Sequence, residues 1–178
     1  MAKQKTGGPS PVIADRLRRC RRQMNKKRIK AYLISHRVDH CYLTGFTGED
    51  SAVIVTPRDV HIVSDGRFDE CINRECPWAK KWLRKGQLND EIAKVCKELK
   101  LTSLAVQQDH MTVVDHATIS KLNKSTRLIK APPIVTDMRR LKSPAELPTI
   151  RKAIRVAEEA FEAMRASIRI GQTELELA

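Results

Sequence analysis

The feature that most constrains the fold is a change of hydrophobic periodicity after residue 65. Before it, the apolar runs 51–56 and 61–64 have strand length and flank the turn-like sequence at 57–59, which predicts a β-hairpin. After it, helical spacing alternates with strand-length runs, in the order 88–99, 103–106, 114–122 and 127–130. Hairpin strands followed by alternating helices and strands predict an α/β fold, in which a mixed sheet carries flanking helices.

The segment before the hairpin adds a helix and a strand to this expectation. Pro11 starts an ordered stretch in which apolar residues recur at steps of four, three and four among basic residues, at Ile13, Leu17, Cys20 and Met24. That spacing predicts an amphipathic helix. The short apolar run 31–35 follows and has the length of a strand.

A domain edge is predicted at Ala131-Pro132-Pro133, because proline does not continue a helix and favours extended backbone in the residue before it. We therefore expect a flexible N-terminus over 1–10, an α/β domain over 11–135, and over 136–178 a linker and the first helix of another domain. Two capping boxes, Ser143 with Glu146 and Thr173 with Glu176, predict helix starts in the last part.

The helix predicted after Ser143 carries an apolar seam over six turns. Its members step by three and four, at Leu147, Ile150, Ile154, Ala157, Phe161, Met164 and Ile168. Such a seam needs a partner surface, supplied by the first domain, by a further domain or by a second copy of the chain. Because a new helix begins just before Ala178, we expect the sequence to be part of a longer polypeptide.

Charge is concentrated at the front of the chain. Residues 1–30 hold eleven Lys or Arg against the single Asp15, which contributes +10 of the net +13. The basic stripe on the first helix could neutralise phosphates, which makes a nucleic-acid-binding module the alternative function. The basic stripe consists of Arg18, Arg19, Arg21, Arg22, Lys26, Lys27 and Arg28. A solvated helix face is the simpler interpretation.

The five cysteines, Cys20, Cys41, Cys71, Cys76 and Cys96, include no C-x-x-C pair, so neither a disulfide framework nor a zinc knuckle is predicted. Residues 1–10 lack the apolar region of a secretory signal, and no apolar run is long enough to span a bilayer. We therefore expect a cytoplasmic protein with reduced thiols.

Four stretches resemble motifs of the creatinase/aminopeptidase P/prolidase (Xaa-Pro metallopeptidase) family, in the family's order. Residues 42–48 (YLTGFTG) are similar to its Y-L-T-G-F-x-G loop, and 64–68 (SDGRF) resemble T-D-x-R-Y. Residues 138–146 (MRRLKSPAE) are similar to the R-x-x-K-S-x-x-E junction, and 168–174 (IRIGQTE) resemble I-R-P-G-x-T-E. Departures are Ile170 in place of proline, Pro148 inside the first helix, and Glu49-Asp50 after the loop glycine.

The resemblance implies a ribonuclease H-like N-terminal domain followed by the first helix of a "pita-bread" catalytic domain. It also implies a parent enzyme that cleaves Xaa-Pro peptides, or creatine in the creatinase branch, with two divalent metal ions (Mn, Co or Zn). No histidine follows His116, so the catalytic ligands are absent from this chain, which we expect to be inactive alone. Its expected roles are contact with its own catalytic domain, homo-oligomer formation and shaping of the substrate entrance. No membrane is expected as a partner, and nucleic acid is the less favoured one.

The family's Y-L-T-G-F loop comes near the active site of a neighbouring subunit, which makes Phe46, Glu49 and Asp50 candidates for substrate contact, with Arg67 as a further entrance residue. The alternative is that Gly45 and Gly48 only permit a tight turn while Phe46 fills the core. Arg67 is more simply explained as a partner of Asp65.

The histidines give no strong metal pattern. His36 and His40 flank Asp39, but we place them in a loop between strands, without the fixed helical face that makes such spacing useful. The dipeptides Asp109-His110 and Asp115-His116 flank Thr112, a predicted helix cap. No metal site is therefore predicted in this chain.

Overall fold

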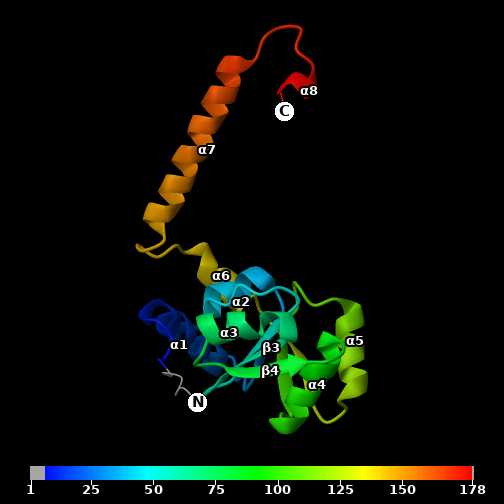
Figure 1. Ribbon diagram of the computed structural model, residues 1–178. Coiled ribbons are helices and arrows are strands. Elements are labelled where there is room, and N and C mark those ends of the chain that lie inside the picture. Colours follow the sequence, from blue (N-terminus) through cyan, green and yellow to red (C-terminus); the bar gives the residue numbers. More distant parts are fainter. Residues whose placement is uncertain (1–6, 178) are drawn as a thin grey trace. The chain divides into compact units, whose positions relative to one another are not determined.

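The computed structural model describes residues 7–177 (Figure 1). The elements follow in the order α1 (Pro11–Lys26), β1 (Tyr32–Ile34), α2 (Arg37–Thr44), β2 (Ala52–Val55), β3 (Val60–Asp65), the 3₁₀ helix η1 (Gly66–Phe68), α3 (Asp69–Glu75), β4 (Lys80–Arg84), α4 (Leu88–Glu98), β5 (Ser103–Gln107), α5 (Val113–Leu122), β6 (Arg127–Ala131), α6 (Ile134–Arg140), α7 (Leu147–Ser167) and α8 (Glu174–Leu177). The predicted flexible N-terminus falls mainly on residues 1–6, which lie outside the described part.

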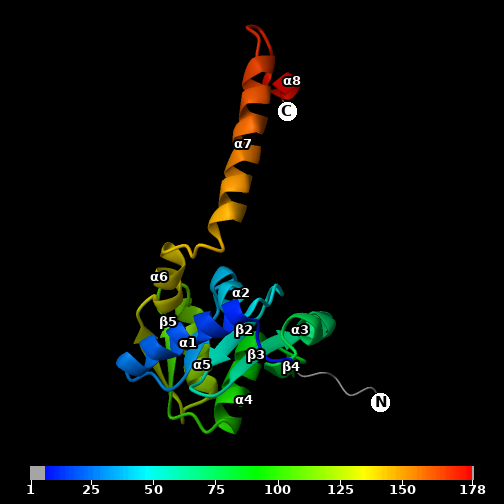
Figure 2. The ribbon, with the colours of Figure 1, turned by 90° about the vertical axis from the view of Figure 1, so that its left-hand side faces the viewer.

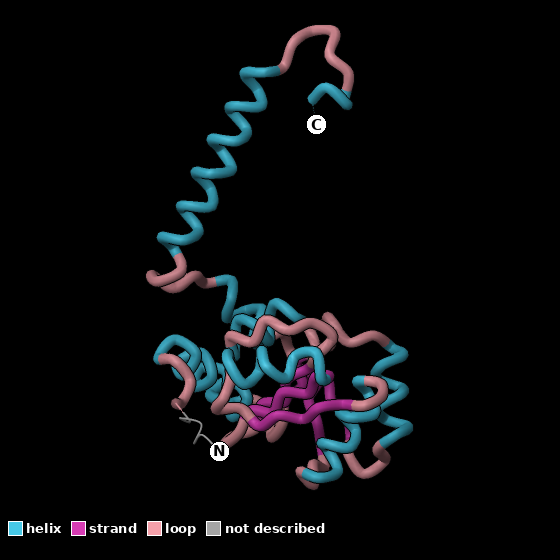
Figure 3. Tube along the Cα trace, viewed as in Figure 1, coloured by secondary structure: helices cyan, strands magenta, loops and turns pink. Residues whose placement is uncertain are grey.

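One six-stranded mixed sheet organises the first unit, with strand order β4-β3-β2-β1-β5-β6. Strands β1, β2 and β3 pair antiparallel, and β3 with β4, β1 with β5 and β5 with β6 pair parallel. Figure 3 shows these strands gathered between helices. The predicted mixed α/β sheet, including the hairpin over 51–64, is confirmed.

Both faces of the sheet are covered, because alternate strand residues point to opposite sides. On one face Tyr32 and Ile34 of β1 pack with α1, α2, α3 and α6 in one hydrophobic cluster. On the other face Leu33 packs with Ile92 of α4 and Ile119 of α5 in a second cluster. Figures 1 and 2 show these helices on the two sides of the sheet.

Five elements were not predicted, namely α2, η1, α3, β4 and α6. Residues 36–44, expected as a loop, form α2, an eight-residue helix that ends at Gly45 in the left-handed conformation, with φ 81°. Strand β4 also went unrecognised, because Lys80, Lys81 and Arg84 make it strongly charged. Charge is common on an edge strand, where it discourages pairing with other molecules.

The chain divides into two compact units, 1–139 and 140–178. Helix α6 lies almost wholly in the first unit, because Ile134, Val135 and Met138 are buried in the cluster that also contains α1. The division thus falls a few residues beyond the edge predicted after residue 135.

In the second unit, Ser143 Oγ and the Ser143 N–H both donate to the Glu146 carboxylate, at 2.7 and 2.9 Å. Helix α7 nevertheless begins at Leu147, four residues after the predicted cap. This start places Pro148 in the first helical turn, where its missing N–H is not needed. No side chain of α7 is buried, and the predicted apolar seam is exposed at Ile154, Phe161 and Met164.

Candidate functional site

The turn after α2 is fixed by two glycines with different roles. Gly45 adopts a left-handed conformation to end α2, and its N–H donates to the Cys41 carbonyl at 2.8 Å. Gly48 instead leaves room for a neighbour, since a Cβ atom there would lie 2.2 Å from Cζ of Phe46. The Phe46 ring therefore requires a glycine two residues later.

Phe46 is a core residue in this structure. Its side chain is fully buried, and its ring centroid lies 5.7 Å from that of His40 and 6.2 Å from that of Phe68 in an edge-on contact. The alternative, in which Phe46 fills the core, thus describes its position. Substrate contact by Phe46 stays a prediction, since the buried ring presents no exposed surface in this structure.

Thr47 fastens the turn to α3, a contact that sequence reasoning missed. The Thr47 N–H donates to Oε2 of Glu75 at 2.9 Å, and the Thr47 hydroxyl donates to Oε1 at 3.0 Å. Glu75 is separated from Thr47 by 28 residues, so no local pattern indicates the pair. The contact limits the movement of the turn relative to the domain.

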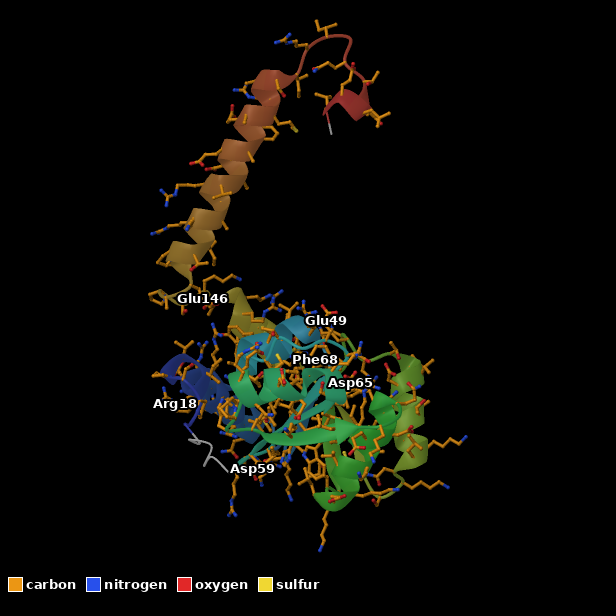
Figure 4. All side chains as sticks on the ribbon, viewed as in Figure 1. Arg18, Glu49, Asp59, Asp65, Phe68 and Glu146 are labelled. Carbon is orange, nitrogen blue, oxygen red and sulfur yellow. The ribbon has the colours of Figure 1, made fainter. Side chains whose placement is uncertain are left out.

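Glu49 and Asp50 differ in how they are held. The Glu49 side chain is 70% exposed, and its carboxylate lies 3.5 Å from Nε of Arg37. Asp50, at φ 48°, accepts a hydrogen bond from Arg84, which also donates to Asp65 Oδ2 at 3.1 Å. Figure 4 shows Glu49 and Asp65 in this region of the first unit. Of the two predicted carboxylates, Glu49 is the more available to a ligand.

Arg67 pairs with Asp65, as the simpler interpretation had it. Its guanidinium lies 2.7 Å from Asp65 Oδ2 and 3.8 Å from Asp50 Oδ2. The hydrogen bonds from Arg67 hold the pKa of the Asp65 carboxyl below its usual value. The predicted entrance residues Asp50 and Arg67 are therefore joined with Arg84 and Asp65 in one network on the surface.

A second, buried network centres on Asp39 of α2. The Asp39 side chain is completely buried. Its Oδ2 accepts from Gln107 Nε2 at 2.7 Å and from Thr136 Oγ1 at 3.1 Å, and its Oδ1 accepts from Arg139 Nη1 at 2.7 Å. The carboxylate thus joins α2, β5 and α6, and a charged partner compensates its burial.

Two histidines meet beside Asp39. The rings of His36 and His110 stack at 3.7 Å between centroids with an interplanar angle of 4°, and His36 Nδ1 lies 3.5 Å from Asp39 Oδ2. One potential ligand atom from each of these three residues lies within 4.8 Å of the others. Our placement of His36 and Asp39 in a loop is wrong, because His36 caps α2 and Asp39 lies in its first turn.

His110, rather than the predicted neighbour His40, completes this group. Burial lowers the pKa of His40 to about 4, so its imidazole is neutral at physiological pH. His40 Nδ1 is buried without a hydrogen-bond partner. The dipeptide at 109–110 gave the only sequence signal for His110, and nothing in it indicated proximity to His36.

An open pocket of about 470 Å³ lies over these residues. His36, His40 and His110 line it together with Asp50 and Asp115. The pocket therefore reaches His36 and His110 and extends to Asp50 of the surface network, whereas Asp39 lies buried behind the two histidines.

This group does not fit the two-metal centre expected of the parent enzyme. Within residues 7–177 it is the one set of three potential ligands that comes together. It offers a single carboxylate, whereas two metal ions need several carboxylates to hold and bridge them. No catalytic step is assigned to it.

Part of the basic run on α1 serves the fold. Arg16 donates to the Tyr42 carbonyl at 2.8 Å and lies over the Tyr42 ring, and Arg21 donates to the carbonyls of Thr56 and Asp59 at 3.0 and 3.2 Å. Arg21 was predicted to belong to the phosphate-binding stripe, but its guanidinium is already bound to these two carbonyls. Arg18 remains on the outside, with 79% of its side chain exposed.

Within residues 7–177, no helix has the length and apolar character needed to cross a bilayer.

Comparison with known proteins places these features in context. An Xaa-Pro dipeptidase from Bacillus anthracis superimposes with a TM-score of 0.84 at 24% identity, over 93% of this chain and 46% of that chain. The N-terminal domain of the cytoplasmic peptidase PepQ from Mycobacterium tuberculosis H37Rv superimposes with a TM-score of 0.64 at 22% identity, over 69% of this chain and 97% of that domain.

Among curated proteins, the uncharacterized peptidase YqhT of Bacillus subtilis (strain 168) is 22% identical over 163 residues, which make up 92% of this chain. The chain spans about half the length of this relative, 46%. The family model of the creatinase/prolidase N-terminal domain matches residues 16–141, which include the Y-L-T-G-F turn, the Asp65 to Arg67 pair and the whole sheet. The chain therefore belongs to the creatinase/prolidase N-terminal domain family.

Proposed function

We propose that this chain is the non-catalytic N-terminal part of an Xaa-Pro metallopeptidase whose catalytic domain follows residue 178. The observation that carries the proposal is the match of the family model to residues 16–141, combined with the coverage of only 46% of the Bacillus anthracis Xaa-Pro dipeptidase. In the parent, peptide hydrolysis needs divalent metal ions that activate water and polarise the carbonyl. A creatinase-like amidinohydrolase parent is the alternative within the family.

The contribution of the domain, on this proposal, is to shape the substrate entrance and to make subunit contacts. The turn 45–50 is suited to such a role, because Thr47 is fastened to Glu75 while the Glu49 side chain remains 70% exposed. A rigid turn with an exposed carboxylate can receive a positively charged group such as a peptide amino terminus. Cytoplasmic location is part of the proposal, supported by five free thiols and by the relative PepQ.

The proposal is tested by assaying two proteins side by side on Xaa-Pro dipeptides with manganese, cobalt or zinc. The 178-residue chain is expected to show no turnover above a buffer control. The longer polypeptide, extended by the reading frame after Ala178, is expected to cleave the bond before proline. Metal-dependent cleavage by the short chain, freed of host peptidases, would contradict the non-catalytic assignment. A reading frame that ends at Ala178 would contradict the longer parent.

A further inference from the structure

We propose that His36, Asp39 and His110 form a binding site for one divalent transition-metal ion within the N-terminal domain. Two imidazoles and one carboxylate are a common donor set for ions such as Zn²⁺ and Co²⁺. The three potential ligand atoms lie within 4.8 Å of one another. The inference rests on these contacts alone and does not depend on the peptidase proposal.

The topology brings the three residues together. Strands β1 and β5 are parallel neighbours, so their carboxyl ends meet at the same edge of the sheet. His36 lies two residues beyond the end of β1, and His110 lies three residues beyond the end of β5. Asp39 comes from the first turn of the helix that starts at this edge. Ligands in open α/β sheets commonly bind outside the carboxyl ends of strands.

The surroundings of Asp39 resemble the outer shell of a metal site. Gln107, Thr136 and Arg139 hold the carboxylate in one orientation, with Oδ2 turned toward His36. Partners of this kind orient a ligating carboxylate. Arg139 binds the other oxygen, Oδ1, and so offsets the negative charge of the carboxylate.

His36 has an unused coordinating atom at this position. Its Nδ1 is buried 3.5 Å from Asp39 Oδ2 and makes no hydrogen bond, which is costly for an imidazole nitrogen, and a metal ion bound to both atoms would satisfy it. The side chains of His36 and His110 are 30% and 29% exposed, and both line the open pocket of about 470 Å³. An ion can therefore enter from solvent and retain water in its remaining positions.

Binding requires one change in the pair of rings. Metal ions bind imidazole in the plane of the ring, and two rings stacked at an interplanar angle of 4° hold their nitrogen lone pairs in parallel planes that do not meet. The His110 ring must therefore tilt out of the stack so that both lone pairs converge. His110 lies in the connection between β5 and α5, where a side-chain rotation does not disturb a helix or strand.

The test uses Co²⁺ as probe on the whole 178-residue chain, followed by its visible absorption. We expect one saturable equivalent without a thiolate charge-transfer band, because the ligands are nitrogen and oxygen. His36→Gln and His110→Gln should each weaken binding at least about tenfold, the scale of losing a contact in a metal site. His116→Gln is the matched control, since His116 is exposed outside the group, and it should bind as the wild type does.

A second measurement needs no substitution. Long-range ¹H–¹⁵N spectra of the histidines with Zn²⁺ should shift the ring nitrogens of His36 and His110 and leave those of His61 unchanged, because His61 is bound to Trp82. The site is refuted if Co²⁺ binds more weakly than about 1 mM, a standard free energy near −4 kcal/mol. It is also refuted if a thiolate band appears, or if the two variants bind as tightly as His116→Gln.

Discussion

At the level of single residues, the ring of Phe46 requires that position 48 be glycine. A Cβ atom at position 48 would lie 2.2 Å from Cζ and 2.8 Å from Cε2 of that ring. Because the ring is fully buried, it cannot move aside without disturbing the core. We expect Gly48→Ala to lower the free energy of unfolding by about 1–3 kcal/mol, the usual cost of an overpacked core. Urea denaturation followed by circular dichroism measures this loss.

Gly66→Ala is the matched control, since a Cβ atom at Gly66 would meet no heavy atom within 4 Å. It should change the unfolding free energy by no more than about 0.5 kcal/mol, as for an ordinary surface substitution. Equal effects of the two substitutions would show that the Phe46 ring does not constrain position 48.

Burial of His40 makes the unfolding free energy of the domain fall as the pH falls. Burial lowers its pKa from 6.5 to about 4, so the unfolded chain binds a proton more readily than the folded one. The stabilising contribution of neutral His40 is complete above pH 6.5 and is lost as the pH falls toward 4. The loss can reach about 3 kcal/mol, at 1.36 kcal/mol per pKa unit.

The measurement compares unfolding free energies of the wild type and of His40→Gln across this pH range. The wild type should lose more stability than the variant, while the exposed His116→Gln protein should follow the wild type. Parallel curves for the wild type and His40→Gln would mean that another group titrates.

At the scale of the element, the sequence predicted those helices and strands whose apolar residues repeat over several turns or fill a buried run. Helix α4 and strand β5 were predicted within one or two residues, since Ile92 and Val95 repeat at helical spacing and 103–107 is almost entirely buried. Helix α2 was missed because its eight residues bury both polar and apolar side chains, including Asp39 and His40. What fixes α2 is the buried carboxylate network, which joins residues 100 positions apart and leaves no local signal.

The exposed apolar face of α7 is a candidate surface for self-association of the chain. Ile154, Phe161 and Ile168 are each about half exposed. An exposed stripe of this length usually marks a contact surface, so the 178-residue chain should self-associate. Phe161→Asp should raise the dissociation constant at least about tenfold, because it places a charge in the apolar contact. Light scattering over a concentration series measures the change.

Ala163→Asp adds the same charge on the opposite face of α7 and serves as the control, since it should leave the association unchanged. A monomeric wild type at all concentrations, or equal weakening by both substitutions, would contradict the role of this face.

At the scale of the whole molecule, the order of motifs indicated the family before any contact was known. The turn 42–48 and the segment 64–68 could be recognised locally because glycine and charged residues in them are fixed by their own neighbours. Their joint geometry could not be predicted. Asp50 lies beside Arg67 and shares Arg84 with Asp65, and Arg84 belongs to the charged edge strand β4, which the sequence pattern did not indicate.

This geometry gives Glu49 and Asp50 different expected effects on catalysis by the longer polypeptide. Asp50 is tied to Arg84, while the Glu49 side chain is 70% exposed and its carboxylate lies 3.5 Å from the exposed Arg37. If the turn receives the amino terminus of a peptide, Glu49 supplies most of the attraction. Replacing both residues, Glu49→Ser with Asp50→Gly, should then raise KM several-fold with little change in kcat, because an exposed ionic contact contributes at most ~1 kcal/mol.

The single substitutions separate the two carboxylates. Glu49→Ser should reproduce most of the rise in KM, whereas Asp50→Gly should change KM little and leave the fold intact, since φ of 48° at position 50 suits glycine. Steady-state kinetics of the longer polypeptide on Xaa-Pro substrates measures these effects, and thermal unfolding checks the fold. An N-blocked substrate, which lacks the positive charge, should be cleaved equally by the wild type and Glu49→Ser. If Glu49→Ser keeps wild-type KM and kcat on substrates with a free amino terminus, the turn is structural only.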